Sequence, residues 1–133
     1  MKKLRLLIFG IFIICSLSTI VAQKKNTIEI NGASLIVPFS TFNYDTTMGK
    51  DALTKVEKLI CSNSKYKIIS FNLVAEIDSG LFTNKNLGNI FNPNIKKMIS
   101  QIKPGKSIWI EEINAKGPED KVAFLMPIRI KVQ

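Results

Sequence analysis

The stretch of sequence that decides the fold is KIISFNLVAEID, residues 67–78. Apolar and polar side chains alternate along it, as they do in a β-strand with one buried and one solvated face. The buried face is predicted to carry Ile69, Phe71, Leu73, Ala75 and Ile77. The solvated face carries Ser70, Asn72, Glu76 and Asp78, and Ile68 and Val74 interrupt the pattern. Because the run is long, we expect a central strand of an antiparallel sheet.

The next segment, Ser79 to Phe91, is rich in Asn and Gly and is predicted to be a loop. It also carries large apolar residues, so we expect it to pack against the domain. A helix is predicted to follow, because Asn92 is a good cap and Pro93 fits the first helical position. Apolar residues at helical spacing continue it as far as Pro104-Gly105; they are Ile95, Met98, Ile99 and Ile102.

Two strands are predicted to finish the chain, one from Ile108 to about Ala115 and one from Val122 to Val132. The second alternates inward apolar residues with outward Arg129 and Lys131. Because the connection from Lys116 to Asp120 is short, the two strands are expected to form a hairpin.

Upstream of residue 67, the pair Asn31-Gly32 lies between two β-prone runs and predicts a two-residue hairpin with φ > 0 at both central residues. The segment Phe39 to Met48 is aromatic and turn-rich. An amphipathic helix is predicted next, from the apolar stripe Leu53, Val56, Leu59 and Ile60. Together these elements predict one α+β domain, a mostly antiparallel sheet with two short packed helices.

The N-terminus has the features of an export signal. Lys2, Lys3 and Arg5 precede an apolar run from Leu6 to Ala22, and polar residues return at Gln23. We therefore expect residues 1–22 to be a signal peptide and residues 23–133 to be the exported domain, periplasmic, in the cell envelope or secreted. The alternative is an uncleaved anchor, because about 17 apolar residues is the lower limit for a helix that spans a bilayer.

The composition excludes several kinds of chemistry. The 133 residues contain no His, which removes the usual general base and the usual zinc ligand. They contain two Cys, and if Cys15 leaves with the signal, Cys61 is the only thiol and is expected to be a small buried residue. No Gly-rich phosphate loop or calcium-binding loop is present. We therefore predict no catalytic residue, no cofactor and no metal site.

One pair of carboxylates keeps an enzymatic alternative open. Glu76 and Asp78 are two apart on the predicted strand and point to the same face, as an acid–base pair in a small secreted hydrolase could. That hypothesis requires a concave pocket and a raised carboxyl pKa. Glu111 and Glu112 are adjacent, so they face opposite ways unless the strand bulges.

The chain has 19 Lys and Arg against 10 Asp and Glu, and this positive charge could attract a negatively charged partner. The basic residues are almost all Lys, whereas proteins that read bases and phosphates favour Arg, so nucleic acid is not expected. A solvated surface explains most of the charge. If the charge has a function, we expect a weak preference for an acidic protein face, a polysaccharide or lipid headgroups.

The end of the chain resembles a known family. The run IWIEEINAKGPED, residues 108–120, followed by LMPIRIKV, residues 125–132, is similar to the end of the C-terminal domain of GldM/PorM proteins. The strand Ile69 to Val74 and the following helix are also similar, and the resemblance covers roughly residues 37–132. Where the family often has Gly, this chain has Asp120 and Lys121, which implies a different turn.

The resemblance implies a role in the gliding-motility and type IX secretion apparatus. GldM-like proteins are inner-membrane proteins whose terminal domain contacts other envelope components and catalyses nothing. The helical stem and the intervening domains of that family are missing here, so a motor-shaft role is not expected. We predict a stand-alone, exported protein-binding module whose partner is another envelope protein with an acidic face, and membrane contact only if the N-terminal segment is uncleaved. The candidate contacts are the 79–91 segment, with Phe82 and Leu87 as anchors, and the last hairpin near Lys116 and Lys121.

Overall fold

The structure is a computed structural model that describes residues 28–40, 43–78 and 80–133. The predicted signal peptide or anchor and Cys15 lie outside these residues. The elements in chain order are β1 (Glu29–Asn31), β2 (Ser34–Val37), β3 (Tyr44–Met48), α1 (Lys50–Thr54), β4 (Lys58–Cys61), β5 (Lys67–Ile77), β6 (Gly80–Leu87), α2 (Pro93–Gln101), β7 (Ser107–Lys116), the 3-10 turn η2 (Pro118–Asp120), β8 (Val122–Leu125) and β9 (Ile128–Val132). No helix within the described ranges is long and apolar enough to cross a membrane.

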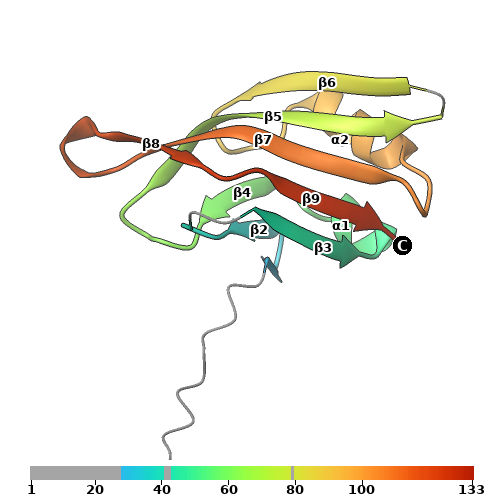
Figure 1. Ribbon diagram of the computed structural model, residues 1–133, viewed down its shortest axis with the longest axis horizontal. Helices are drawn as coiled ribbons and strands as arrows, with labels where there is room; N and C mark the ends of the chain where they lie inside the picture. The colour runs from blue at the N-terminus through green and yellow to red at the C-terminus, as the bar shows by residue number, and fades with distance from the viewer. Residues whose placement is uncertain (1–27, 41–42, 79) are drawn as a thin grey trace, which may run out of the picture.

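Two sheets and two short helices form a single small α+β domain, as predicted. The large sheet has the order β3-β9-β7-β5-β6, which runs from bottom to top in Figure 1, and β8 also pairs with β7. The small sheet has the order β1-β2-β4. Most pairings are antiparallel, and β2–β4 and β3–β9 are parallel.

One hydrophobic core joins the sheets and helices. The large sheet contributes fully buried side chains from three strands, and the small sheet and α2 contribute the rest. Examples are Phe71, Leu73, Ile108, Ile110, Ile128 and Ile130 from the large sheet, Leu35 and Leu59 from the small sheet, and Ile95 and Ile102 from α2 or its end. Alternation along β5, β7 and β9 therefore places one face of the large sheet, here called the inner face, against the core.

Strand β5 is an interior strand, as predicted, but its first residues are arranged differently. Ile69 is exposed and Ile68 is buried, because the register against β7 shifts on either side of Ser70. The second shift is matched by Glu112, which has a φ of 48°. Each extra residue in a β-bulge reverses the alternation that follows it, so the prediction that Ile69 faces the core was wrong.

The predicted helix through Leu59 and Ile60 was also wrong beyond its first turn. Helix α1 ends at Thr54, and Lys58–Cys61 form strand β4, in parallel register with β2. The backbone N–H of Glu57 donates to Ala33 O over 2.8 Å, which starts this pairing. Leu53, Val56 and Leu59 are buried as predicted, but five residues of helix lead into a strand because tertiary pairing outweighs the weak local helical preference.

Three other segments refine the sequence predictions. Residues 44–48 of the turn-rich segment form β3, which adds to β9. In the first hairpin Asn31 pairs with Ser34, so Gly32 and Ala33 are the central residues, and of these two only Gly32 has a positive φ, 59°. The last strand is divided into β8 and β9, which keep one continuous register against β7 on either side of residues 126–127.

Candidate binding surface

The segment predicted to be a loop, Ser79 to Phe91, contains an edge strand, and this correction determines the candidate site. Strand β6 pairs antiparallel with β5 over its whole length. Asp78, with a φ of 48°, leaves β5 at the connection between the two strands, and Asp tolerates that conformation. The triplet Asp-Ser-Gly at residues 78–80 is the sequence signal that could have revealed this hairpin.

The two faces of β6 have an inverted polarity. Phe82, Asn84 and Asn86 lie opposite the buried residues of β5, so they share the inner face of the sheet. Leu81 and Leu87 lie opposite Glu76 and Ser70 on the outer face, where they are 65% and 79% exposed. Amides therefore face the core side, and leucines face solvent.

The inner amides have a structural function. Asn86 is completely buried, and its Nδ2 donates to the carbonyl oxygens of Gly88 and Ile90 at 3.0 and 2.9 Å. Its Oδ1 accepts from the backbone N–H of Asn92 at 2.8 Å. The side chain of Asn92 in turn caps α2 by accepting from Ile95 N, and donates to Asn84 Oδ1 at 3.0 Å. These amides fix the N-terminus of α2 beside β6.

The outward edge of β6 has backbone groups without a partner strand. Gly88 N donates to Ile69 O over 2.6 Å, which fixes the phase of the ladder. In an antiparallel pair alternate residues bond to the neighbour, so Leu81, Thr83, Lys85 and Leu87 point their N–H and C=O groups away from β5. Side-chain amides occupy the carbonyls of Lys85 and Leu87. Among the described residues nothing bonds to the outward groups of Leu81 and Thr83.

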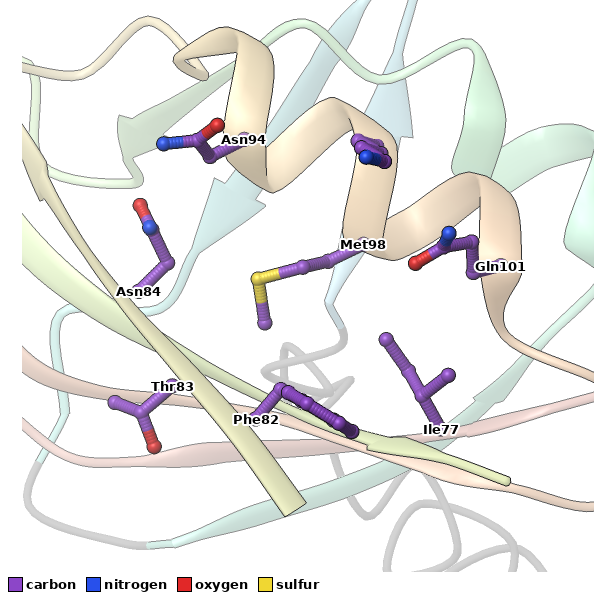
Figure 2. Close-up of a pocket in the computed structure, with 8 residues that line it drawn as sticks. Ile77, Phe82, Thr83, Asn84, Asn94, Met98 and Gln101 are labelled. Carbon is purple, nitrogen blue, oxygen red and sulfur yellow. The ribbon is translucent and has the colours of Figure 1, made fainter. Parts of the chain in front are cut away.

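A groove of about 310 Å³ lies between this edge and α2 (Figure 2). Its apolar lining comes from Ile77, Phe82 and Met98, and the Met98 side chain reaches from the helix toward the strand. Polar residues complete the lining; they are Thr83, Asn84, Asn94, Lys97 and Gln101, of which Thr83 directs its side chain away from α2 (Figure 2). We call this feature the β6–α2 groove. Its dimensions and mixed lining suit part of a peptide.

The four predicted contact residues do not form one site. Phe82 lines the groove and is 53% exposed, whereas Leu87 is on the outer face, because residues five apart on a strand point to opposite sides. Lys116 and Lys121 lie at the far hairpin and form ion pairs with Asp120 and Glu119 at 3.1 and 3.7 Å. These pairs are exposed and therefore weak, but they offset much of the positive charge of the turn.

The turn of the last hairpin has two consecutive residues in the left-handed conformation. Glu119 and Asp120 both have positive φ values, 58° and 59°, where glycine is the usual choice. Gly117 packs under the ring of Tyr66, which a Cβ at that position would overlap. Phe124 on β8, in the same hairpin, is 79% exposed, and the sequence interpretation missed it.

Glu76 and Asp78 are both bound to lysines rather than arranged for catalysis. Glu76 accepts from the backbone N–H of Ser107 at 3.2 Å and from Lys106 Nζ at 3.4 Å. Asp78 is exposed and contacts Lys103 Nζ at 2.9 Å. The hydrogen bond and the charge of Lys103 lower the pKa of Asp78, the opposite of what a general acid needs. Both carboxylates hold the α2–β7 connection onto β5.

The remaining chemical candidates have structural roles. Cys61 is buried in β4, and burial raises the pKa of its thiol, which disfavours the reactive thiolate. Glu111 and Glu112 could share a face only if their strand bulged. Strand β7 does bulge there, but Glu112 accepts a hydrogen bond from Asn72. Across the described ranges no three Cys, Asp or Glu side chains gather as metal ligands would.

Comparison with known proteins agrees with the resemblance in the last third of the chain. A search of curated proteins finds no match. The model of one protein family, described as the GldM C-terminal domain, matches residues 55–133. That range contains β4 to β9 and α2, and therefore both the edge strand and the groove. The chain belongs to the GldM C-terminal domain family.

Proposed function

We propose that this protein is an exported, non-catalytic binding module that attaches to another protein of the bacterial cell envelope through strand β6. The GldM C-terminal domain is a structural domain of type IX secretion, periplasmic in that system, and is not a known enzyme. Association with other envelope components of the secretion system is what membership of the family implies.

Four large apolar side chains exposed along residues 81–90 carry this proposal. They are Leu81, Phe82, Leu87 and Ile90, with exposed fractions between 53% and 79%. A strand that leaves apolar side chains and backbone groups in solvent at a sheet edge is a liability unless a partner covers it. The Phe82 and Leu87 anchors are therefore retained from the sequence prediction, and Lys116 and Lys121 are at most peripheral.

Export is the second part of the proposal. The basic and apolar residues at the start of the chain support cleavage after Ala22, with residues 23–133 as the mature domain. Mass spectrometry of the protein purified from its native envelope tests this directly. A mature chain that starts at Gln23 is expected, and a chain that retains Met1 to Ala22 means an anchored protein instead.

Affinity purification of the tagged full-length chain from chemically cross-linked native envelopes tests the binding function. Replacing the whole 79–91 segment by Gly and Ser is unsuitable, because it would remove a strand of the sheet. Point variants keep the fold: Leu81→Ser with Leu87→Ser on β6, and Val122→Ser with Phe124→Ser on β8 as the matched control.

We expect the parent and the β8 variant to retain the same envelope protein, and the β6 variant to lose it by about tenfold, the equivalent of 1.4 kcal/mol. If the parent retains nothing beyond the tag alone, the binding function is wrong. If the β8 variant loses the partner while the β6 variant keeps it, the hairpin is the contact surface and β6 is not.

A further inference from the structure

We propose that the β6–α2 groove binds an extended, acidic peptide segment of the partner, which adds to β6 as a further strand and inserts an aliphatic side chain beside Phe82 and Met98. This inference rests on the proposed function and specifies the chemistry of the partner. It requires three features to lie together: an open sheet edge, an apolar recess next to it, and a positive charge within reach.

The open edge is the first feature. Leu81 and Thr83 each direct a backbone N–H and C=O away from β5, and Lys85 directs its N–H the same way. Asn92 closes the far end of this edge by bonding to Lys85 O. Strand addition therefore starts at Gly80 and ends near Lys85, long enough for four or five main-chain hydrogen bonds by the alternation of an antiparallel ladder.

The recess is the second feature. Side chains of an added strand alternate between the faces of the sheet, so every second peptide residue points toward α2. The β6–α2 groove lies on that side, with Phe82 and Met98 as its apolar contacts (Figure 2). The hydrogen bonds between β6 and the start of α2 that the described residues make all involve Asn92, at one end of the groove, and the other end is open to a peptide.

Charge is the third feature. The groove lining contains Lys97 and no carboxylate. Asp78, next to the lining residue Ile77, is already paired with Lys103. Lys97 makes no ion pair with any residue in the part of the chain that the structure describes. A peptide with an aliphatic residue and, two positions along, an Asp or Glu that points to the same face therefore complements the groove.

The probe is a fluorescein-labelled peptide of eight residues, Thr-Val-Thr-Glu repeated twice, in which Val and Glu point to the same face; it is titrated against the full-length protein at low salt. The control peptide has Lys in place of Glu. Two further peptides carry N-methyl groups, on the Thr nitrogens in one and on the Val and Glu nitrogens in the other. Because alternate N–H groups point to opposite edges of a strand, each methylated peptide blocks a different edge.

We expect the Glu peptide to bind, the Lys peptide to bind at least tenfold more weakly, and the two methylated peptides to differ from one another by about tenfold. Amide signals of Leu81, Thr83 and Lys85 are expected to shift in the NMR spectrum. Failure of the Glu peptide to bind, equal affinity of the two methylated peptides, or shifts confined to another surface would overturn the inference.

Two protein variants locate the site. Lys97→Glu should weaken the Glu peptide by about tenfold, whereas Lys96→Glu, on the same helix but outside the groove lining, should change its affinity less than twofold. Thr83→Pro removes an outward N–H and leaves the β5 ladder intact, so it should abolish binding while the circular dichroism spectrum stays unchanged. Equal effects of the Lys96 and Lys97 variants would contradict the inference.

The same variants separate this inference from the function on which it rests. If a folded Thr83→Pro protein still retains the envelope partner as well as the parent does, strand addition is wrong and the binding function stands. If the parent retains no partner, the binding function itself is wrong.

Discussion

Strands β5 and β6 are neighbours in one sheet and consecutive along the chain, and their leucines face opposite sides of that sheet. Strand β5 places its apolar residues against the core and its polar residues in solvent, apart from the bulge at Ile69. Strand β6 places amides inward and leucines outward. Because β6 contributes its amides to the fold, its outward leucines remain available to a partner. The comparison therefore separates residues that stabilise the domain from residues that a partner could contact.

The largest effect is expected from truncating the inner face of β5. Phe71 is 1% exposed and packs against Phe91 with ring centroids 5.6 Å apart. Phe71→Ala should lower the free energy of unfolding by about 3–5 kcal/mol in urea titrations, because it leaves a cavity in the core. Leu87→Ala on β6 is the matched control and should change it by less than about 0.5 kcal/mol. Similar losses for both variants would contradict the contrast between the strands.

The second test is whether the inner side of β6 stabilises the domain through polar contacts. Asn86→Ala removes the donor for the carbonyls of Gly88 and Ile90 and the acceptor for Asn92 N. We expect a loss of about 2–3 kcal/mol, since buried backbone groups are left unsatisfied. Asn84→Ala, at a less buried site with one side-chain contact, should lose about 0.5–1 kcal/mol. A neutral Asn86→Ala would mean that the buried amide does not hold α2 in place.

The outer side of β6 is predicted to be dispensable for stability. Leu81→Thr combined with Leu87→Thr keeps strand propensity and should change the free energy of unfolding by less than about 0.5 kcal/mol. Retention on a hydrophobic-interaction column should fall, because two exposed leucines are lost. A loss of stability larger than about 1 kcal/mol would show that the leucines pack within the domain rather than serve a partner.

The smallest effect is expected at the turn between the two strands. Lys103 lowers the pKa of Asp78, so this carboxylate stabilises the fold above the ordinary Asp pKa of about 3.9, and the contribution disappears as the pH falls through the lower folded value. Asp78→Asn tolerates the same backbone conformation and lacks the charge. Its urea midpoint should lie slightly below that of the parent near neutral pH and converge with it in acid. A gap that widens in acid would contradict this sign.

The contrast between the two strands also explains which parts of the fold were predictable. Strand β5 after its bulge, helix α2 and the alternation along β9 were predicted correctly, because burial imposes a period on their residues and Asn92-Pro93 provides a cap with a local mechanism. Strand β6 was not predicted, because its leucines point toward solvent instead of the core and its Asn residues are typical of loops. Lys58–Cys61 carries a helical period by coincidence and becomes a strand by pairing with β2.

The candidate site was predictable only in part. Phe82 and Leu87 were identified from the sequence as apolar residues in a polar segment, and both are exposed. Their opposite directions follow from strand geometry that the loop prediction could not provide. Lys97 was seen as one lysine among several, and only the structure shows that Lys103 and Lys106 are paired while Lys97 lines the groove.

The sequence by itself determined the family and the fold class, because hydrophobic period and the terminal hairpin motif are local properties of the chain. Strand pairing, bulges and ion-pair partners join residues far apart along the chain, and no local pattern specifies them. The tertiary structure alone decided that a polar segment becomes the edge of the sheet, since burying the Asn86 amide requires the carbonyls of the 88–90 turn and the N-terminus of α2 around it.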